Sequence, residues 1–84
     1  MLYLVATPGQ QLAAGTEGPW TEVRPVEAGL AFVDSDQHRS AVYHAVKDAL
    51  PAGAPLLVAE VHEVPKCRGL APGALAWARA RLPR

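Results

Sequence analysis

The sequence predicts a small α+β domain on the ferredoxin-like plan, a split βαβ sheet in the order strand, helix, strand, strand, helix, strand (βαββαβ). A further helix is expected at the C-terminal end. Three observations predict this fold: short apolar runs of strand length, two runs separated by turn residues, and one apolar stripe at helical spacing. The 84 residues are enough for a single domain, residues 1–84.

The first half of the chain predicts three strands and a short crossover helix. Residues 2–6 are apolar and precede a Pro-Gly break, which is typical of a strand buried on both faces. Residues 10–14 can form one or two helical turns, a short crossover for this plan. Residues 20–26 alternate and residues 30–33 return after a turn, which predicts a hairpin. Pro25 places the first of these strands at a sheet edge or ends its pairing.

The second half predicts a helix, a strand and a last helix. The first helix is expected to run to about residue 50 after an N-cap at Ser35 or Asp36. Its apolar stripe consists of Val42, Ala45, Val46, Ala49 and Leu50. Residues 55–64 begin apolar and then alternate, as in a strand with a solvated end, and residues 73–82 follow with helical spacing. We expect the helices to cover one face of the sheet.

Composition excludes several classes of protein. Eight Lys and Arg balance eight Asp and Glu, so a strongly basic nucleic-acid wrapper is excluded. The single cysteine excludes a disulfide scaffold. No apolar run reaches about 18 residues and no basic segment precedes an apolar core, so neither a membrane span nor a secretory signal is expected. We expect a cytoplasmic protein, and the Ala, Gly, Pro and Arg bias indicates a GC-rich, bacterial genome.

The neutral total hides a basic C-terminal segment. Residues 1–64 hold three cations and all eight acids, a net charge of −5, whereas residues 65–84 hold five cations and no acid, a net charge of +5. The segment is expected to be a loop followed by the last helix. It can fold back on the acidic body, dock on a second copy or another protein, or contact nucleic-acid phosphates.

No cofactor or metal site is expected. Gly9, Gly15 and Gly18 do not fit a phosphate-binding loop and are interpreted as turn residues. His38 and His44 are six positions apart, which puts them on different sides of a helix and does not match the close ligand pairs of a zinc site.

Three residues are the candidates for catalysis. Glu60 and His62 are two positions apart on one strand and therefore share a face, where they can act as an acid–base pair. Cys67 lies between Lys66 and Arg68, whose charges favour the thiolate, and His62 is a possible base for it. The alternative is that these are a solvated strand end and an ordinary free thiol.

A second group of residues is a candidate binding surface. Arg39, Tyr43 and Lys47 recur at i, i+4 and i+8 on the predicted central helix, where an aromatic ring between two cations can stack on a base or hold an acidic partner. The basic segment adds four further cations, which are Lys66, Arg68, Arg79 and Arg81. The alternative interpretation is an ordinary solvated face.

Size and composition favour association. A single core of this size rarely supplies more than about 3–5 kcal/mol, and neither a disulfide nor a metal is expected to assist. The leading hypothesis is a non-enzymatic module that forms a homodimer or docks on another protein. The alternatives are a nucleic-acid-binding accessory protein that uses the basic segment, and a small enzyme or ligand-binding domain around Glu60, His62 and Cys67. Whether the chain is an enzyme stays open, and no membrane partner is expected.

Overall fold

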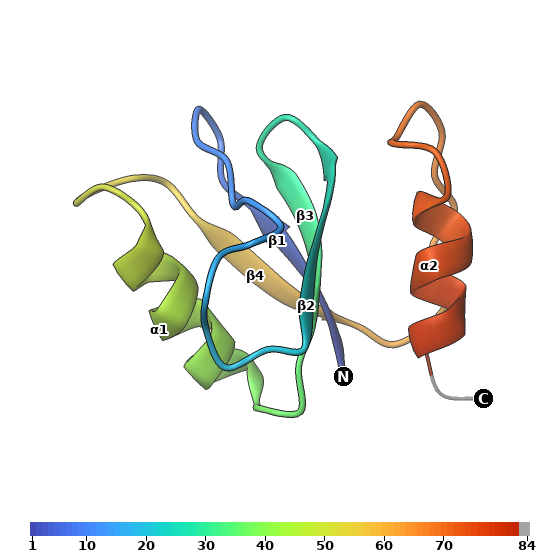
Figure 1. The fold of residues 1–84 in the computed structure, drawn as a ribbon, viewed down its shortest axis with the longest axis horizontal. Coiled ribbons are helices and arrows are strands. Elements are labelled where there is room, and N and C mark those ends of the chain that lie inside the picture. The colour runs from blue at the N-terminus through green and yellow to red at the C-terminus, as the bar shows by residue number, and fades with distance from the viewer. Residues whose placement is uncertain (83–84) are drawn as a thin grey trace.

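A four-stranded antiparallel sheet lies between two helices in the computed structural model, which describes residues 1–82 (Figure 1). The elements are β1 (Leu2–Ala6), β2 (Glu22–Glu27), β3 (Leu30–Asp34), α1 (Arg39–Ala49), β4 (Leu57–Val61) and α2 (Ala74–Arg81). The strand order is β2-β3-β1-β4, and every neighbouring pair is antiparallel. The predicted α+β class is confirmed. Neither helix, among the described residues, has the length and apolar character that a membrane crossing requires.

The two helices cover opposite faces of the sheet, so the expectation that both lie on one face is wrong. Tyr3 and Val5 of β1 point to the α1 face, where they pack with Val42 and Val46. Leu2 points the other way and packs with Trp77 and its neighbours on α2. The physical reason is that β1 is apolar at successive positions. Because successive side chains point to opposite faces, both faces need a cover.

The predicted crossover helix is also absent, since the structure has only turns and bends between β1 and β2. Leu12 is the one buried apolar residue of this segment, with 2 % of its surface exposed. A single apolar anchor flanked by Gly and Pro gives no stripe for a helix to bury, so the chain crosses as an irregular segment. The Trp20 indole N–H closes it by donating to the Thr16 carbonyl at 2.8 Å.

The start of α1 differs from the prediction as well. The helix begins at Arg39, and its N-cap, His38, makes no side-chain capping bond, so neither Ser35 nor Asp36 is the cap. The buried Ser35 hydroxyl instead donates to the Pro19 carbonyl and accepts the Gln37 N–H at 3.0 Å. This hydroxyl therefore joins the end of the first crossover to the start of α1.

Pro25 lies on β2, which is an edge strand, as the sequence predicts. The β2–β3 register shifts between Pro25 and Glu27, so the edge is irregular there. The hairpin turns through Ala28 and Gly29, and Gly29 has a φ of +71°, which favours glycine.

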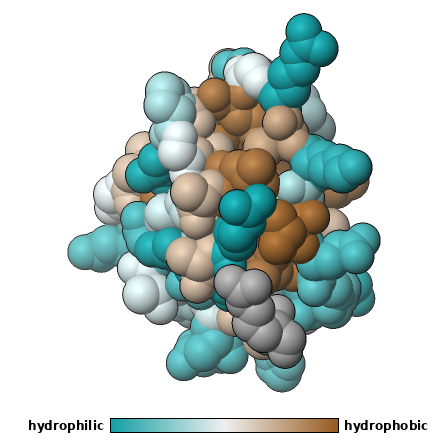
Figure 2. Space-filling view, turned by 90° about the vertical axis from the view of Figure 1, so that its right-hand side faces the viewer, coloured by the Kyte–Doolittle hydropathy of each residue, from teal (hydrophilic) through white to brown (hydrophobic). Residues whose placement is uncertain are grey.

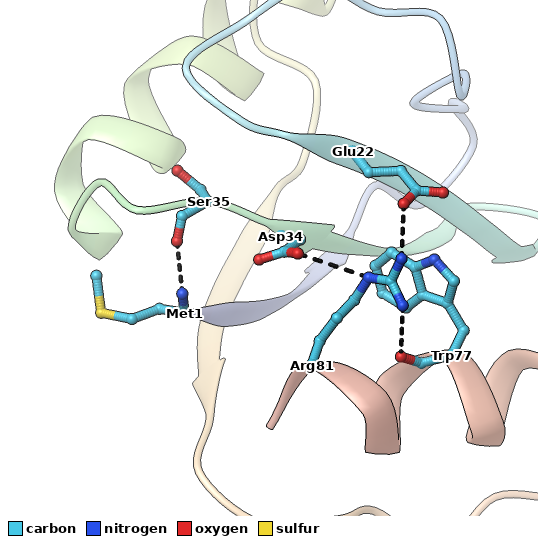
Figure 3. A network of polar contacts seen from close by, with 6 residues as sticks. All are labelled: Met1, Glu22, Asp34, Ser35, Trp77 and Arg81. Carbon is cyan, nitrogen blue, oxygen red and sulfur yellow. Dashed lines mark hydrogen bonds and ion pairs between the residues drawn. The ribbon is translucent and has the colours of Figure 1, made fainter. Parts of the chain in front are cut away.

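Arg81 fixes α2 to the sheet (Figure 3). Its guanidinium lies 3.9 Å from the centre of the Trp77 ring, and Trp77 in turn stacks on Phe32 with ring centres 6.3 Å apart. The same group donates to Glu22 at 2.9 Å and lies 3.5 Å from the Asp34 carboxylate. One cation of the basic segment is thus folded back on the acidic body. Apolar residues group on this side of the molecule between polar ones (Figure 2).

Two substitutions of Arg81 should weaken the packing of α2 on the sheet to different extents. Arg81→Met keeps an apolar stem over Trp77 and removes the charge, so we expect it to lower the free energy of unfolding by about 1 kcal/mol. Arg81→Ala removes both and should cost about 2 kcal/mol. Urea unfolding followed by circular dichroism measures both values. The matched control is Arg79→Ala, an exposed position on the same helix. An equal effect at Arg79 and Arg81 would contradict the assigned role.

Candidate functional site: the open edge of β4

One edge of the sheet is closed by the chain itself. On β2, Pro25 has no N–H to offer, and the Ala71 N–H donates to the Val26 carbonyl at 2.8 Å. The Arg24 guanidinium donates to the Pro72 carbonyl at 3.1 Å. The segment that leads into α2 therefore covers the outer side of β2 at Val26, and Pro25 interrupts the ladder that a further strand would join there.

The opposite edge, β4, is open, and the pairing of β1 shows which backbone groups face outward. Met1 and Ser35 exchange two backbone bonds, of 2.7 and 3.0 Å, and the Thr7 N–H donates to the Gly29 carbonyl at 2.8 Å. Odd-numbered positions of β1 therefore bond to β3. Because bonding direction alternates along a strand, the even-numbered residues bond to β4.

The register then divides β4 into inward and outward residues. Leu57, Ala59 and Val61 are the partners of the even-numbered residues of β1, so their backbone groups point inward. Val58 and Glu60 direct their N–H and C=O groups away from the sheet, and none of residues 1–82 bonds to those groups. β4 therefore presents two donors and two acceptors to a partner.

The side chains of β4 do little to guard this edge. Natural edges are commonly protected by Lys, Pro or a bulge. β4 has none of these features, and Glu60 is its one charged residue. Leu57 has 55 % of its surface exposed, the largest value among the large apolar side chains of the described chain.

The α1 flank of this edge contains the predicted stripe of Arg39, Tyr43 and Lys47. Tyr43 and Lys47 line a groove of about 530 Å³ that extends to Leu56, the residue before β4. Tyr43 has 39 % of its surface exposed. Two of the seven predicted binding residues thus share a groove with the residue that precedes the open edge.

The cations of the basic segment lie elsewhere. Arg81 is engaged with Glu22 and Asp34 beside α2. Lys66, Arg68 and Arg79 are exposed and form no ion pair with any described residue. Since α1 and α2 cover opposite faces, the seven predicted binding residues do not form one surface.

The predicted catalytic residues do not share a pocket. His62 Nδ1 lies 3.6 Å from a Glu60 carboxylate oxygen, but β4 ends at Val61, so the expectation that both residues lie on one strand is wrong. The His62 side chain has 77 % of its surface exposed. Cys67 is exposed and lines a hollow of residues 67–76 that contains neither Glu60 nor His62. Within residues 1–82, no three His, Cys, Asp or Glu side chains are grouped so as to hold a metal ion.

Sequence reasoning did not single out Leu57 and Val58, although a signal was present. Of the two edge strands, one contains Pro25, whereas β4 contains neither Pro nor Lys. An unprotected edge of this kind is recognisable once the strand order is known, and the order depends on long-range pairing.

Tyr3 is buried opposite Glu60 and connects the edge to the core. Its hydroxyl donates to the Gln37 carbonyl at 2.6 Å, and the residue has no exposed surface. Burial raises the pKa of Tyr3 above its usual value of 10.0, the Glu60 charge raises it further, and Arg39 lowers it. A phenol whose pKa is raised by folding stabilises the fold below the unfolded pKa of about 10 and loses that contribution as pH rises through the folded pKa.

The free energy of unfolding should therefore fall above pH 10 in a manner that depends on Tyr3. In Tyr43→Phe, Tyr3 is the one remaining tyrosine, and its ultraviolet ionisation should occur above pH 10 while the protein stays folded. Tyr3→Phe should remove its contribution to the alkaline loss of stability. Ionisation of Tyr3 at the ordinary value in folded protein would contradict its burial.

Two proline substitutions test which groups face outward. Ala59→Pro deletes an inward N–H and should lower the free energy of unfolding by at least about 2 kcal/mol. Glu60→Pro deletes an outward N–H and should cost less than about 1 kcal/mol. Thermal and urea unfolding of the two variants give the comparison, and equal destabilisation would contradict the assigned alternation.

Comparison with protein-family models, curated proteins and solved structures finds no match to this chain. The geometry of the described residues is therefore the basis for assigning a function.

Proposed function

We propose that this chain is a small non-enzymatic interaction module that binds an extended strand along the open edge of β4. One observation carries the proposal: Val58 and Glu60 direct unpaired backbone groups outward from β4, whereas the β2 edge is interrupted at Pro25 and covered at Val26. Addition of a strand satisfies such groups by main-chain hydrogen bonds, and adjacent side-chain contacts provide selectivity.

The charges around the edge favour a partner without net charge. Arg39 and Lys47 on the α1 flank are balanced by Asp48 on the same helix and by Glu60 on β4. Because the charges near the edge cancel, neither an acidic nor a basic peptide gains an electrostatic advantage in binding. The exposed Leu57 adds an apolar contact at the start of the strand.

A non-enzymatic role is supported by the exposure of His62, because a catalytic pair is normally held in a pocket that limits access of water. The nucleic-acid alternative has less support. Arg81 is occupied by Glu22 and Asp34, and the ring of Trp77 lies between Arg81 and Phe32. Three exposed cations without an accessible aromatic neighbour are a weak basis for binding nucleic acid.

We further propose that the domain is a variant of the ferredoxin-like plan in which the first crossover is irregular, and that it works in the cytoplasm of a bacterium. The strand order β2-β3-β1-β4 with all pairs antiparallel supports the first point. The free, exposed Cys67 and the amino-acid bias support the second.

A blocked peptide of alternating Thr and Val tests the strand-binding function. Titrated into isotopically labelled protein, it should shift the amide signals of Val58 and Glu60 and slow their hydrogen exchange, while those of Arg24 and Val26 on β2 stay unchanged. Slow exchange of Val58 and Glu60 before any peptide is added indicates that another copy already occupies the edge.

Two matched variants of Glu60 distinguish the contribution of its backbone N–H to peptide binding from that of its charge. Glu60→Pro removes the outward N–H and should abolish the response to peptide, whereas Glu60→Gln removes the same charge, keeps the N–H and should retain the response. Fast exchange at both amides throughout the titration of the unaltered protein would refute the proposal.

A further inference from the structure

We propose that the strand bound by β4 is β4 of a second copy, paired antiparallel about a two-fold axis at Ala59; this inference rests on the proposed strand-binding function. In that register the outward groups of Val58 bond to those of Glu60 in the other copy, and the reverse pair forms by symmetry. Leu57 lies opposite Val61 of the other copy. All five residues of the strand are then paired.

The side chains of β4 fit this self-pairing. The backbone of Ala59 bonds inward to β1, so at the axis Ala59 lies opposite Ala59 of the other copy at a non-hydrogen-bonded site. Opposing Cα atoms at such a site are about 4.5 Å apart. A small side chain suits that close approach. Glu60 lies opposite Val58 of the other copy. The register therefore avoids placing two like charges directly opposite each other, which would be destabilising.

Other two-fold registers fit less well. An axis at Glu60 sets that carboxylate against its own copy. An axis at Val58 pairs three residues of the strand and leaves Glu60 and Val61 without a partner in the strand. An axis at Val61 brings His62 opposite Glu60, but it requires continued pairing beyond the end of β4 at Val61, where the chain leaves the sheet. The axis at Ala59 alone uses the whole strand.

The rest of the surface agrees with a second copy as the partner. The two sheets form one continuous sheet with a β2 strand at each end. Pro25 and the Ala71–Val26 bond interrupt both ends, so neither offers a regular ladder to a third copy and assembly is expected to stop at two copies. Both α1 helices then lie on the same face of the continuous sheet. The α1 flank of each copy carries both positive and negative side chains, so the two flanks do not repel each other as like charges would.

Molar mass in solution tests this assembly. Light scattering after size exclusion, over protein concentrations from ~10 μM to ~500 μM, should show the mass rising from 8.9 kDa towards twice that value. The rise should persist at high salt, because backbone bonds and apolar contacts are screened little. Glu60→Pro should stay at 8.9 kDa, and Glu60→Gln should still dimerise.

A cysteine placed at the axis tests the register. In a Cys67→Ser background, Ala59→Cys should form a disulfide between copies under mild oxidation, because its predicted Cα separation lies within the range that a disulfide spans. Leu57 is exposed, but in this register it lies far from Leu57 of the other copy. Leu57→Cys should therefore cross-link at least tenfold more slowly.

The outcomes separate this inference from the function on which it rests. A monomer at every concentration that still binds the Thr-Val peptide overturns the second copy and leaves strand binding intact. A monomer that ignores the peptide overturns both. A dimer that persists in Glu60→Pro without Ala59→Cys cross-linking, or that dissociates at high salt, uses another surface and also overturns the inference.

Discussion

The burial of β1 is the constraint on which the rest of the structure depends. This strand has neighbours on both sides and apolar side chains on both faces, and Leu2, Tyr3 and Val5 have almost no exposed surface. A strand so placed needs two partner strands and two covers. The partners are β3 and β4, and the covers are α1 on one face and α2 on the other. Burial of β1 thus involves every element of the described structure except β2.

The two edges of the sheet differ because the connections are unequal. The segment before α2 must pass the β2 side, and in doing so it donates its Ala71 N–H to that strand. No comparable segment passes β4, where α1 lies over one face and the outward backbone groups stay unpaired among the described residues. The asymmetry is thus a result of chain routing, and the same routing separates the cations near α2 from the Arg39–Tyr43–Lys47 stripe on α1.

Local pattern was sufficient for most elements and insufficient for their layers. The apolar stripe of Val42 and Val46 predicts α1, and Pro25 predicts an edge strand, because each depends on neighbours within a few residues. Burial of β1 on both faces was expected, but local pattern does not show which element covers the second face, because that cover depends on contacts of Leu2 with Trp77, far along the chain. Ser35 was expected to cap a helix, but its hydroxyl is taken by the distant Pro19 carbonyl. At the candidate site, Glu60 and His62 lie close together, but His62 follows the end of β4 and does not lie on the strand as predicted, and the open edge follows only from the strand order.

The two tryptophans divide between the two halves of the core. Trp20 packs against the cluster beneath α1, and Trp77 belongs to the cluster beneath α2. Each half therefore carries its own fluorophore, and a single Trp→Phe replacement leaves a reporter for one side of the sheet alone. Time-resolved emission of the two variants can show whether the halves melt as one cooperative unit or in succession, with β1 and β3 as the physical link between them.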